Sequence, residues 1–453
     1  MARPEKLQSA RNIGLATIVA ASLWVVGIAA TPQAQAQTFQ VIHTFSGGAD
    51  GDEPVAGPTL DAAGNLYGTT EYGGTFNHCP AFGCGVVYKL VRRGAAWLDT
   101  PIYSFTGSPD GASPYGRVIF GPDGALYGAT ISGGTGSCSL GGLSGCGTVF
   151  KLQPPPTACK SALCPWRETV LYSFASQDDG EFPQAEVAFD QAGDLYSTTQ
   201  LGGAGPCNDG LYTGCGTVFK LTHNADGSWS KSTLYSFQSG PTDGGFPTTG
   251  VLLDQGGNIF GTTGGGGADC NQNDSACGVV YELTPSGSGW SETILHFFTG
   301  GTDGDYPSGL IFDSHGNLYG AAGGGGGGPL GGNGTVFEMT PAQGGGWNFV
   351  LQYAFNYFNN EAAGPGPLTT DAAGNIYGSS DGGGTGGTGT AYKLTASGGG
   401  WSYTTLYSFD FNGSDGFFPQ GKVVLDAQGN LYGTCSTGPY PSPDAGTVWE
   451  IAP

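Results

Sequence analysis

Acidic side chains at a regular spacing are the residues of this sequence best suited to chemistry. The motif Asp-Gly-x-x-Pro begins at Asp50, Asp110, Asp179, Asp243, Asp303 and Asp415. Two carboxylates that flank a glycosidic bond can hydrolyse it, so acids gathered at one mouth would suit a carbohydrate-active hydrolase or lyase. The alternative is turn chemistry, in which each Asp accepts hydrogen bonds from its own backbone. Because the motif recurs so often, we favour the turn.

Three charged residues break the symmetry of these recurring motifs. Arg117, Glu186 and Lys422 each follow a copy of the motif by a few residues. Residues that serve one site are expected to differ between copies, whereas turn residues are expected to repeat. We therefore take Asp110, Arg117, Asp179, Glu186 and Lys422 as candidate ligand-binding residues. Alternatively, Arg117, Glu186 and Lys422 are ordinary solvated charges.

Other catalytic patterns are weak in this sequence. The five histidines are His43, His78, His223, His296 and His315. They support no Ser-His-Asp order, and no nucleophile elbow stands between a strand and a helix. The glycine run 323–328 has no following Lys-Ser/Thr, so it is no phosphate loop. We expect binding rather than catalysis, and no cofactor.

One unit that recurs seven times must position the candidate residues. Copies of Asn-Leu-Tyr-Gly centre on Tyr67, Tyr127, Tyr196, Phe260, Tyr319, Tyr377 and Tyr432, at intervals of 55–69 residues. In the fourth copy, four alternating runs of strand length cover 251–253, 258–262, 279–283 and 293–298. We name them strands A to D. Four antiparallel strands per repeat predict an all-β, seven-bladed β-propeller with four-stranded blades.

Tryptophans support this period. Six of them stand eight residues before a phenylalanine in strand D, as Trp97 does before Phe105. We expect these tryptophans to pack between blades rather than to bind a ligand.

The two ends of the chain predict how the ring closes. Gln40–Phe45 has the pattern of a strand D, and Gly446–Ile451 has the pattern of a strand C. The seventh sheet is complete only if the N-terminal strand pairs with the C-terminal repeat. Such pairing would also remove an exposed sheet edge.

The N-terminus has the layout of a secretory signal peptide. Basic residues precede an apolar run over 13–30, and Ala34-Gln35-Ala36 offers a cleavage point before Gln37. We expect 1–36 to be a signal peptide and 37–453 to be one propeller domain, with an extracytoplasmic location. An uncleaved membrane anchor is the alternative.

Eleven cysteines suit an exported protein. Five local pairs are Cys79 with Cys84, Cys138 with Cys146, Cys159 with Cys164, Cys207 with Cys215 and Cys270 with Cys277, and an oxidising compartment favours disulfides. A zinc site would need four ligands together, whereas these pairs lie mostly in different repeats, so we expect no metal. The remaining cysteine, Cys435, aligns with small residues and is expected to be buried and free.

The repeat resembles a known family. The run Asp-x-x-Gly-Asn-Leu-Tyr-Gly-Thr-Thr, followed by Gly-Gly and Gly-Thr-Val-Phe-Lys-Leu, is similar to the bacterial GloVer tandem repeat, most closely over residues 64–90 and 429–451. The resemblance implies an exported, repeat-built protein, and it implies no known reaction.

Composition limits the partners. The chain has 453 residues, 87 of them glycine, and a formal net charge of −22. This charge argues against nucleic acid and against an anionic membrane surface. We expect a monomer that binds an unidentified protein or polysaccharide through the face formed by the B–C and D–A loops. Two alternatives remain open: a carbohydrate-active hydrolase or lyase, and a structural cell-surface component.

The cysteine pairs also divide the expected loop face into two arcs. Four of them stiffen the B–C loops of the first four repeats, whereas the later repeats carry glycine runs. Stiff loops lose less entropy on binding. We therefore expect a partner to dock on the stapled arc near Asp110, Arg117, Asp179 and Glu186.

Overall fold

A computed structural model describes residues 37–453 except 77–78, 80, 95, 141, 157–164, 209–212, 268–276, 288, 328–331, 412 and 440–444. The expected signal peptide, 1–36, lies outside the described residues. No helix among the residues described is long and apolar enough to cross a membrane.

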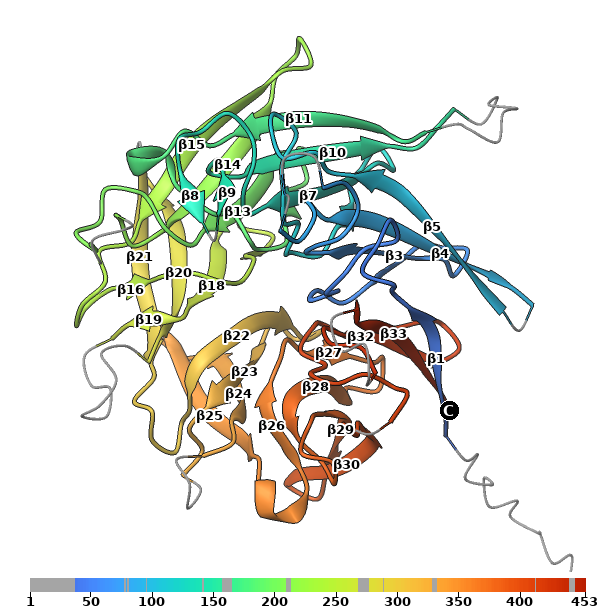
Figure 1. Cartoon of the computed structure of the whole chain (residues 1–453). Helices are drawn as coiled ribbons and strands as arrows, with labels where there is room; N and C mark the ends of the chain where they lie inside the picture. The colour runs from blue at the N-terminus through green and yellow to red at the C-terminus, as the bar shows by residue number, and fades with distance from the viewer. Residues whose placement is uncertain are drawn as a thin grey trace, which may run out of the picture. The chain divides into compact units, whose positions relative to one another are not determined.

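Seven antiparallel sheets form the blades of a propeller, six with four strands and one with an additional short strand (Figure 1). Strand A is β2 (Thr59–Leu60), β6 (Ile119–Phe120), β12 (Ala188–Phe189), β17 (Leu252–Leu253), β22 (Asp305–Phe312), β27 (Thr369–Thr370) and β31 (Val424–Leu425). Strand B is β3 (Leu66–Thr70), β7 (Leu126–Thr130), β13 (Leu195–Thr199), β18 (Ile259–Thr263), β23 (Leu318–Gly324), β28 (Ile376–Gly383) and β32 (Leu431–Cys435). Strand C is β4 (Val86–Arg93), β10 (Thr148–Gln153), β14 (Thr217–His223), β20 (Val279–Ser286), β24 (Thr335–Pro341), β29 (Thr390–Ser397) and β33 (Thr447–Ala452). Strand D is β5 (Ala96–Ser104), β11 (Arg167–Ser173), β15 (Trp229–Ser236), β21 (Gly289–Phe297), β25 (Trp347–Ala354), β30 (Gly400–Ser408) and β1 (Thr38–Thr44).

Short elements decorate the connections between these strands. The strand β26 (Ala362–Pro365) precedes the strand A of the sixth blade in the sequence and pairs with β28. The B–C loops contain β8 (Ser139–Leu140), β9 (Leu143–Ser144) and β19 (Gly265–Gly266), and the last of these pairs with β16 (Gly244–Gly245). Two 3-10 turns, η1 (Gln177–Asp179) and η2 (Tyr357–Asn359), lie in D–A connections.

The N-terminal strand closes the ring as predicted. In Figure 1, β1 lies beside β33, and the register runs from Thr38 opposite Ala452 to Thr44 opposite Thr447. The backbone N–H of Phe45 extends the contact by donating to the carbonyl of Gly446 over 3.1 Å. The seventh blade therefore takes three strands from one end of the chain and one strand from the other.

Aromatic pairs join each blade to the next. A buried phenylalanine that follows strand D meets an aromatic side chain of strand C in the following blade. The pairs are Phe45–Tyr88, Phe105–Phe150, Phe174–Phe219, Phe237–Tyr281, Phe298–Phe337, Phe355–Tyr392 and Phe409–Trp449, with ring centroids 5.0–5.6 Å apart. The contact between Phe409 and Trp449 is tilted and the other six are edge-on, a geometry that aromatic rings favour. The hydrophobic core is therefore divided among the blade interfaces.

The expected role of the tryptophans is confirmed. Trp97 of the first blade packs against Tyr432 of the seventh blade, with ring centroids 6.0 Å apart. Trp166 makes the same contact with Tyr67 of the preceding blade, also at 6.0 Å. The repeat thus places each such tryptophan at the seam with the preceding blade.

Three disulfides staple B–C loops where the spacing predicted them. They join Cys79 to Cys84, Cys138 to Cys146 and Cys207 to Cys215. Disulfides indicate an oxidising, extracytoplasmic environment. Cys435 is free and fully buried, as expected.

Two further predicted disulfides fall on residues that the structure does not describe. Cys159 and Cys164 were expected to pair with each other, and both lie outside the described residues. Cys270, the expected partner of Cys277, also lies outside them. Unlike the other three, these two pairs therefore stay predictions from the sequence.

Candidate functional site

A cavity of about 680 Å³ occupies the centre of the ring. All seven blades contribute the short segment that precedes or begins strand A, and the fourth, fifth and sixth blades also contribute residues in the last part of strand B or just after it. These segments include Val55–Gly57, Tyr115–Arg117, Gln184–Glu186, Thr248–Leu252, Asp305–Leu310, Gly364–Pro367 and Gln420–Lys422. The cavity therefore lies at the end of the channel that carries the B–C and D–A loops.

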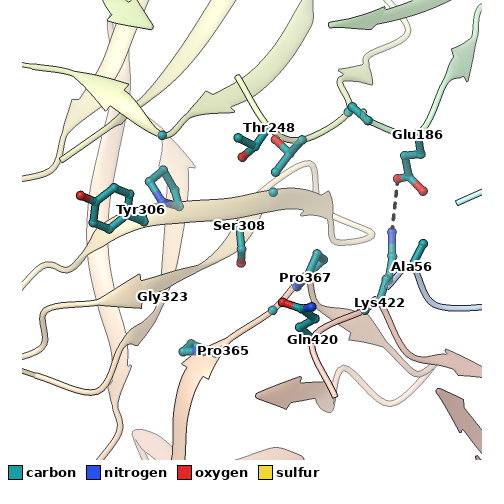
Figure 2. Close-up of a pocket in the computed structure, with 18 of the residues that line it drawn as sticks. Ala56, Glu186, Thr248, Tyr306, Ser308, Gly323, Pro365, Pro367, Gln420 and Lys422 are labelled. Carbon is teal, nitrogen blue, oxygen red and sulfur yellow. Dashed lines mark ion pairs between the residues drawn. The ribbon is translucent and has the colours of Figure 1, made fainter. Parts of the chain in front are cut away.

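Three of the five sequence-predicted site residues meet in this cavity. The Nε of Arg117 lies 2.9 Å from Oε2 of Glu186, and the Nζ of Lys422 lies 4.0 Å from Oε1 of the same carboxylate. The residues come from the second, third and seventh blades, so only the closed ring brings them together. Figure 2 shows Lys422 and Glu186 facing each other on one side of the cavity.

The charges of this cluster perturb one another. Burial alone would raise the pKa of Glu186, but the positive charges of Arg117 and Lys422 overcome it and lower that pKa. Burial lowers the pKa of Lys422; Glu186 opposes this effect and Arg117 adds to it. The Glu186 side chain is still 31% exposed within the cavity. One wall thus presents two cations around one accessible carboxylate.

The opposite side of the cavity has a different character. Figure 2 shows Tyr306 on the side away from Lys422, and Asp305 and Asp381 are among the other residues that line the cavity. Burial raises the pKa of Asp381. Neither acid was predicted from the sequence as a site residue. Asp52 and Glu181 occupy the same repeat position as Asp305, and Glu71 occupies the same position as Asp381, so no departure from the repeat marked them.

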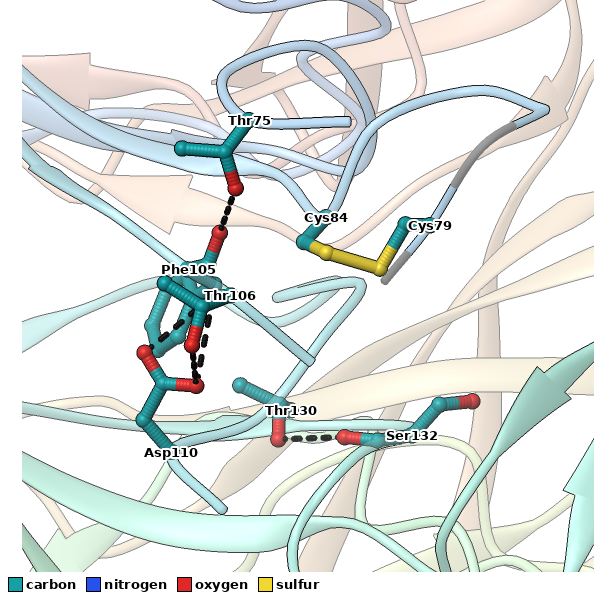
Figure 3. The surroundings of a disulfide bond; sticks show 8 residues. All are labelled: Thr75, Cys79, Cys84, Phe105, Thr106, Asp110, Thr130 and Ser132. Carbon is teal, nitrogen blue, oxygen red and sulfur yellow. Dashed lines mark hydrogen bonds between the residues drawn. A yellow bond between two sulfur atoms is a disulfide. The ribbon is translucent and has the colours of Figure 1, made fainter. Parts of the chain in front are cut away.

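The recurring aspartates serve their own turns. Asp110 accepts hydrogen bonds from the Thr106 backbone N–H at 3.1 and 3.2 Å and from Thr106 Oγ1 at 2.7 Å (Figure 3). It also accepts from the Tyr103 hydroxyl at 2.7 Å. Asp179 accepts in the same way from the Tyr172 hydroxyl and the Ala175 N–H, at 2.7 and 2.8 Å. The structure therefore places these two predicted site residues in D–A turns rather than in the cavity lining.

Metal ligation finds no support in the described part of the chain. No three His, Cys, Asp or Glu side chains among those residues are grouped so that they could hold a metal ion. The cavity also offers hydrogen-bonding groups, and Figure 2 shows Ser308, Thr248 and Gln420 between Tyr306 and Lys422.

The repeat identifies the family. Residues 27–156 and 135–353 match the model of the Gloeobacter/Verrucomicrobia repeat. The chain belongs to this family. The GloVer repeat therefore accounts for the blade periodicity seen both in the sequence and in the sheets. No curated protein sequence matches the chain significantly.

Solved structures resemble this GloVer protein in fold. A fungal alcohol oxidase of the AA5 family, in complex with copper, is 13% identical, with a TM-score of 0.54 over 92% of this chain and 77% of that one. A protein from Lactobacillus plantarum is 14% identical, with a TM-score of 0.46 over 78% of this chain and 84% of that one. At such identities the likeness concerns the fold alone.

Proposed function

We propose that this protein is an exported, non-catalytic binding propeller. Its ligand, a protein or a polysaccharide, occupies the face formed by the B–C and D–A loops and reaches into the central cavity. The observation that carries the proposal is the cluster of Arg117, Glu186 and Lys422, which the repeat does not encode and which lines a cavity of about 680 Å³. Cavities of this size, with a few convergent polar groups, are typical of ligand sites.

The recurring acids favour binding over hydrolysis. Asp110, Asp243 and Asp415 are buried, and each accepts a hydrogen bond from a tyrosine of the preceding strand D. Carboxylates held in this way stabilise turns. They are poorly placed to reach a sugar linkage.

A hydrolase or lyase is the second candidate, and one observation favours it. Asp381 lines the cavity with a raised pKa, as a general acid requires. Its partner would be another cavity acid, such as Asp305 or Glu186. The same binding experiment separates the two candidates when it also records newly formed reducing ends.

A cavity-filling variant tests the proposal. Mature protein, residues 37–453, is screened on a glycan array and then titrated against each hit. Ser308→Trp fills the cavity and is expected to weaken binding at least about tenfold, whereas Ser402→Trp, on the exposed face of β30, leaves it unchanged. Equal affinity of both variants would contradict a cavity site. New reducing ends that Asp381→Asn abolishes would establish the hydrolase or lyase. An array without hits would favour a structural cell-surface role.

A further inference from the structure

Exposed aromatic side chains gather on one part of the loop face. Among the described residues, the large apolar side chains exposed in B–C segments, in D–A segments and at the start of strand A are all aromatic: Phe76, Phe82, Tyr306, Tyr357, Phe358, Phe411 and Phe418. We call this set the aromatic arc. The exposed Leu98, Phe297, Val350 and Leu351 lie instead in strand D, at the outer edge of the blades.

The aromatic arc is confined to consecutive blades. Tyr306 belongs to the fifth blade, and Tyr357 and Phe358 to the turn η2 before the sixth. Phe411 and Phe418 precede the seventh blade, and Phe76 and Phe82 lie in the B–C loop of the first. Because the ring closes through β1 and β33, the first and seventh blades are neighbours. The arc therefore runs without a break from blade five to blade one.

The repeat does not require this exposure. Tyr306, Phe418 and Phe182 occupy the same motif position, immediately before the proline, and all three have left-handed backbone angles with φ of 50–60°. Phe182 is fully buried in the third blade, whereas Tyr306 and Phe418 are 48% and 42% exposed. A ring at this position can therefore be buried, but the rings of the fifth and seventh blades are exposed.

The backbone that carries these two rings is held in place. A left-handed φ is unfavourable for a bulky residue and persists only where surrounding contacts impose it. The N–H of Tyr306 donates to the carbonyl of Cys277 in the preceding blade, at 3.0 Å. The N–H of Phe418 donates in the same way to Thr388, also at 3.0 Å. A backbone fixed before binding lowers the entropy that such residues lose on contact.

Charge and side-chain type indicate the ligand. Flat aromatic faces suit the C–H faces of pyranose rings, and the exposed large apolar side chains of the aromatic arc are all aromatic. The net charge of −22 repels acidic polymers. We infer that the aromatic arc binds a neutral polysaccharide, whose chain passes from Tyr306 across Phe418 toward Phe82. This inference rests on the proposed loop-face binding function and names its ligand class.

Affinity electrophoresis of the mature protein tests the inference, with neutral polysaccharides in one set of gels and polygalacturonate in another. The double variant Tyr306→Ala, Phe418→Ala should weaken binding to neutral polysaccharide about tenfold, at about threefold for each ring. The control Leu98→Ala, Leu351→Ala removes exposed apolar side chains from the outer strands instead. It should retain the affinity of the parent protein, and both variants should keep the parent melting temperature.

Each other result overturns the inference. If neutral polysaccharide binds but only Ser308→Trp weakens it, the cavity function stands and the aromatic arc is not the site. Binding to polygalacturonate alone, or to a protein alone, would keep the loop-face function and remove the neutral polysaccharide. If no polysaccharide retards the protein, the inference is wrong, and the glycan array then decides separately whether the proposed function survives.

Discussion

Gly446 of the last blade and Pro54 of the first blade meet where the ring closes. A methyl group built on Gly446 would lie 2.2 Å from Cδ of Pro54, and Gly446 has a φ of 69°. The same glycine–proline contact recurs between other neighbouring blades, for example between Gly85 and Pro114. The closing seam therefore has the same packing as the seams within the chain.

Substitution of this glycine should weaken the seam. We expect Gly446→Ala to lower the free energy of unfolding by roughly 2–4 kcal/mol, because it adds a steric clash to an unfavourable φ. Gly64→Ala is the control: its φ is 78°, and no atom lies within 4 Å of the added methyl group. Its cost should be only about 1 kcal/mol. Urea denaturation measures both, and equal losses would show that the contact with Pro54 is unimportant.

Carboxyl groups buried between blades should make stability depend on pH. The Tyr235 hydroxyl lies 2.9 Å from Glu292 Oε2 and 3.1 Å from Asp243 Oδ2. Burial and the charge of Asp243 raise the pKa of Glu292 to about 8. The folded protein therefore keeps a proton that the unfolded chain releases above its ordinary pKa of about 4.3. Stability should fall as the pH rises from about 4.5 to 8.

Glu292→Gln should remove part of this dependence. We expect it to raise the free energy of unfolding at pH 8 by about 1–2 kcal/mol, since solvent screens part of the side chain. At pH 5 it should have little effect. In the third blade the corresponding residue is Lys231, whose Nζ lies 3.0 Å from Asp179. Lys231→Gln should therefore destabilise the protein at both pH values. A benefit of Glu292→Gln that is equal at pH 5 and pH 8 would contradict the titration.

The carboxylate of Glu186 should hold the cavity cluster together. Glu186→Gln leaves Arg117 and Lys422 as neighbouring positive charges in a partly buried site. We expect a loss of about 1–3 kcal/mol in the free energy of unfolding, measured by urea denaturation. Adding Lys422→Met to this variant should recover part of the loss, because one of the two repelling charges is gone. No recovery would mean that the two cations do not interact.

The cysteines should show one reactive thiol only after denaturation. Cys435 is fully buried in β32, and burial raises its pKa well above the ordinary value. An alkylating reagent should therefore spare the native protein and modify Cys435 in the denatured, unreduced protein. Peptide mapping should also find Cys159 bonded to Cys164, and Cys270 bonded to Cys277. A second free thiol, or a bridge between blades, would refute this arrangement.

The repeat made much of the fold predictable from the sequence. Each blade encodes its own turns, as when Asp61 accepts from the N–H of Asn65 at 2.9 Å. Each blade also encodes its seams, as when Trp97 meets Tyr432. The predicted ends of the strands were less accurate. In the fourth blade, strand D begins at Gly289 and not at Thr293 as predicted, because its pairing with strand C continues to Ser286 opposite Gly289.

The sequence by itself determined the number of blades, the closing strand and the turn role of the recurring aspartates, because these depend on contacts that every copy repeats. Only the tertiary structure decided which side chains share the cavity. Glu186 and Lys422 stand in different blades, and their charges meet only across the closed ring. The structure also decided that Phe182 is buried and Phe418 exposed, although both occupy the same repeat position. The shared backbone conformation sets where such a side chain begins, whereas the burial of its ring depends on the neighbours that each blade supplies.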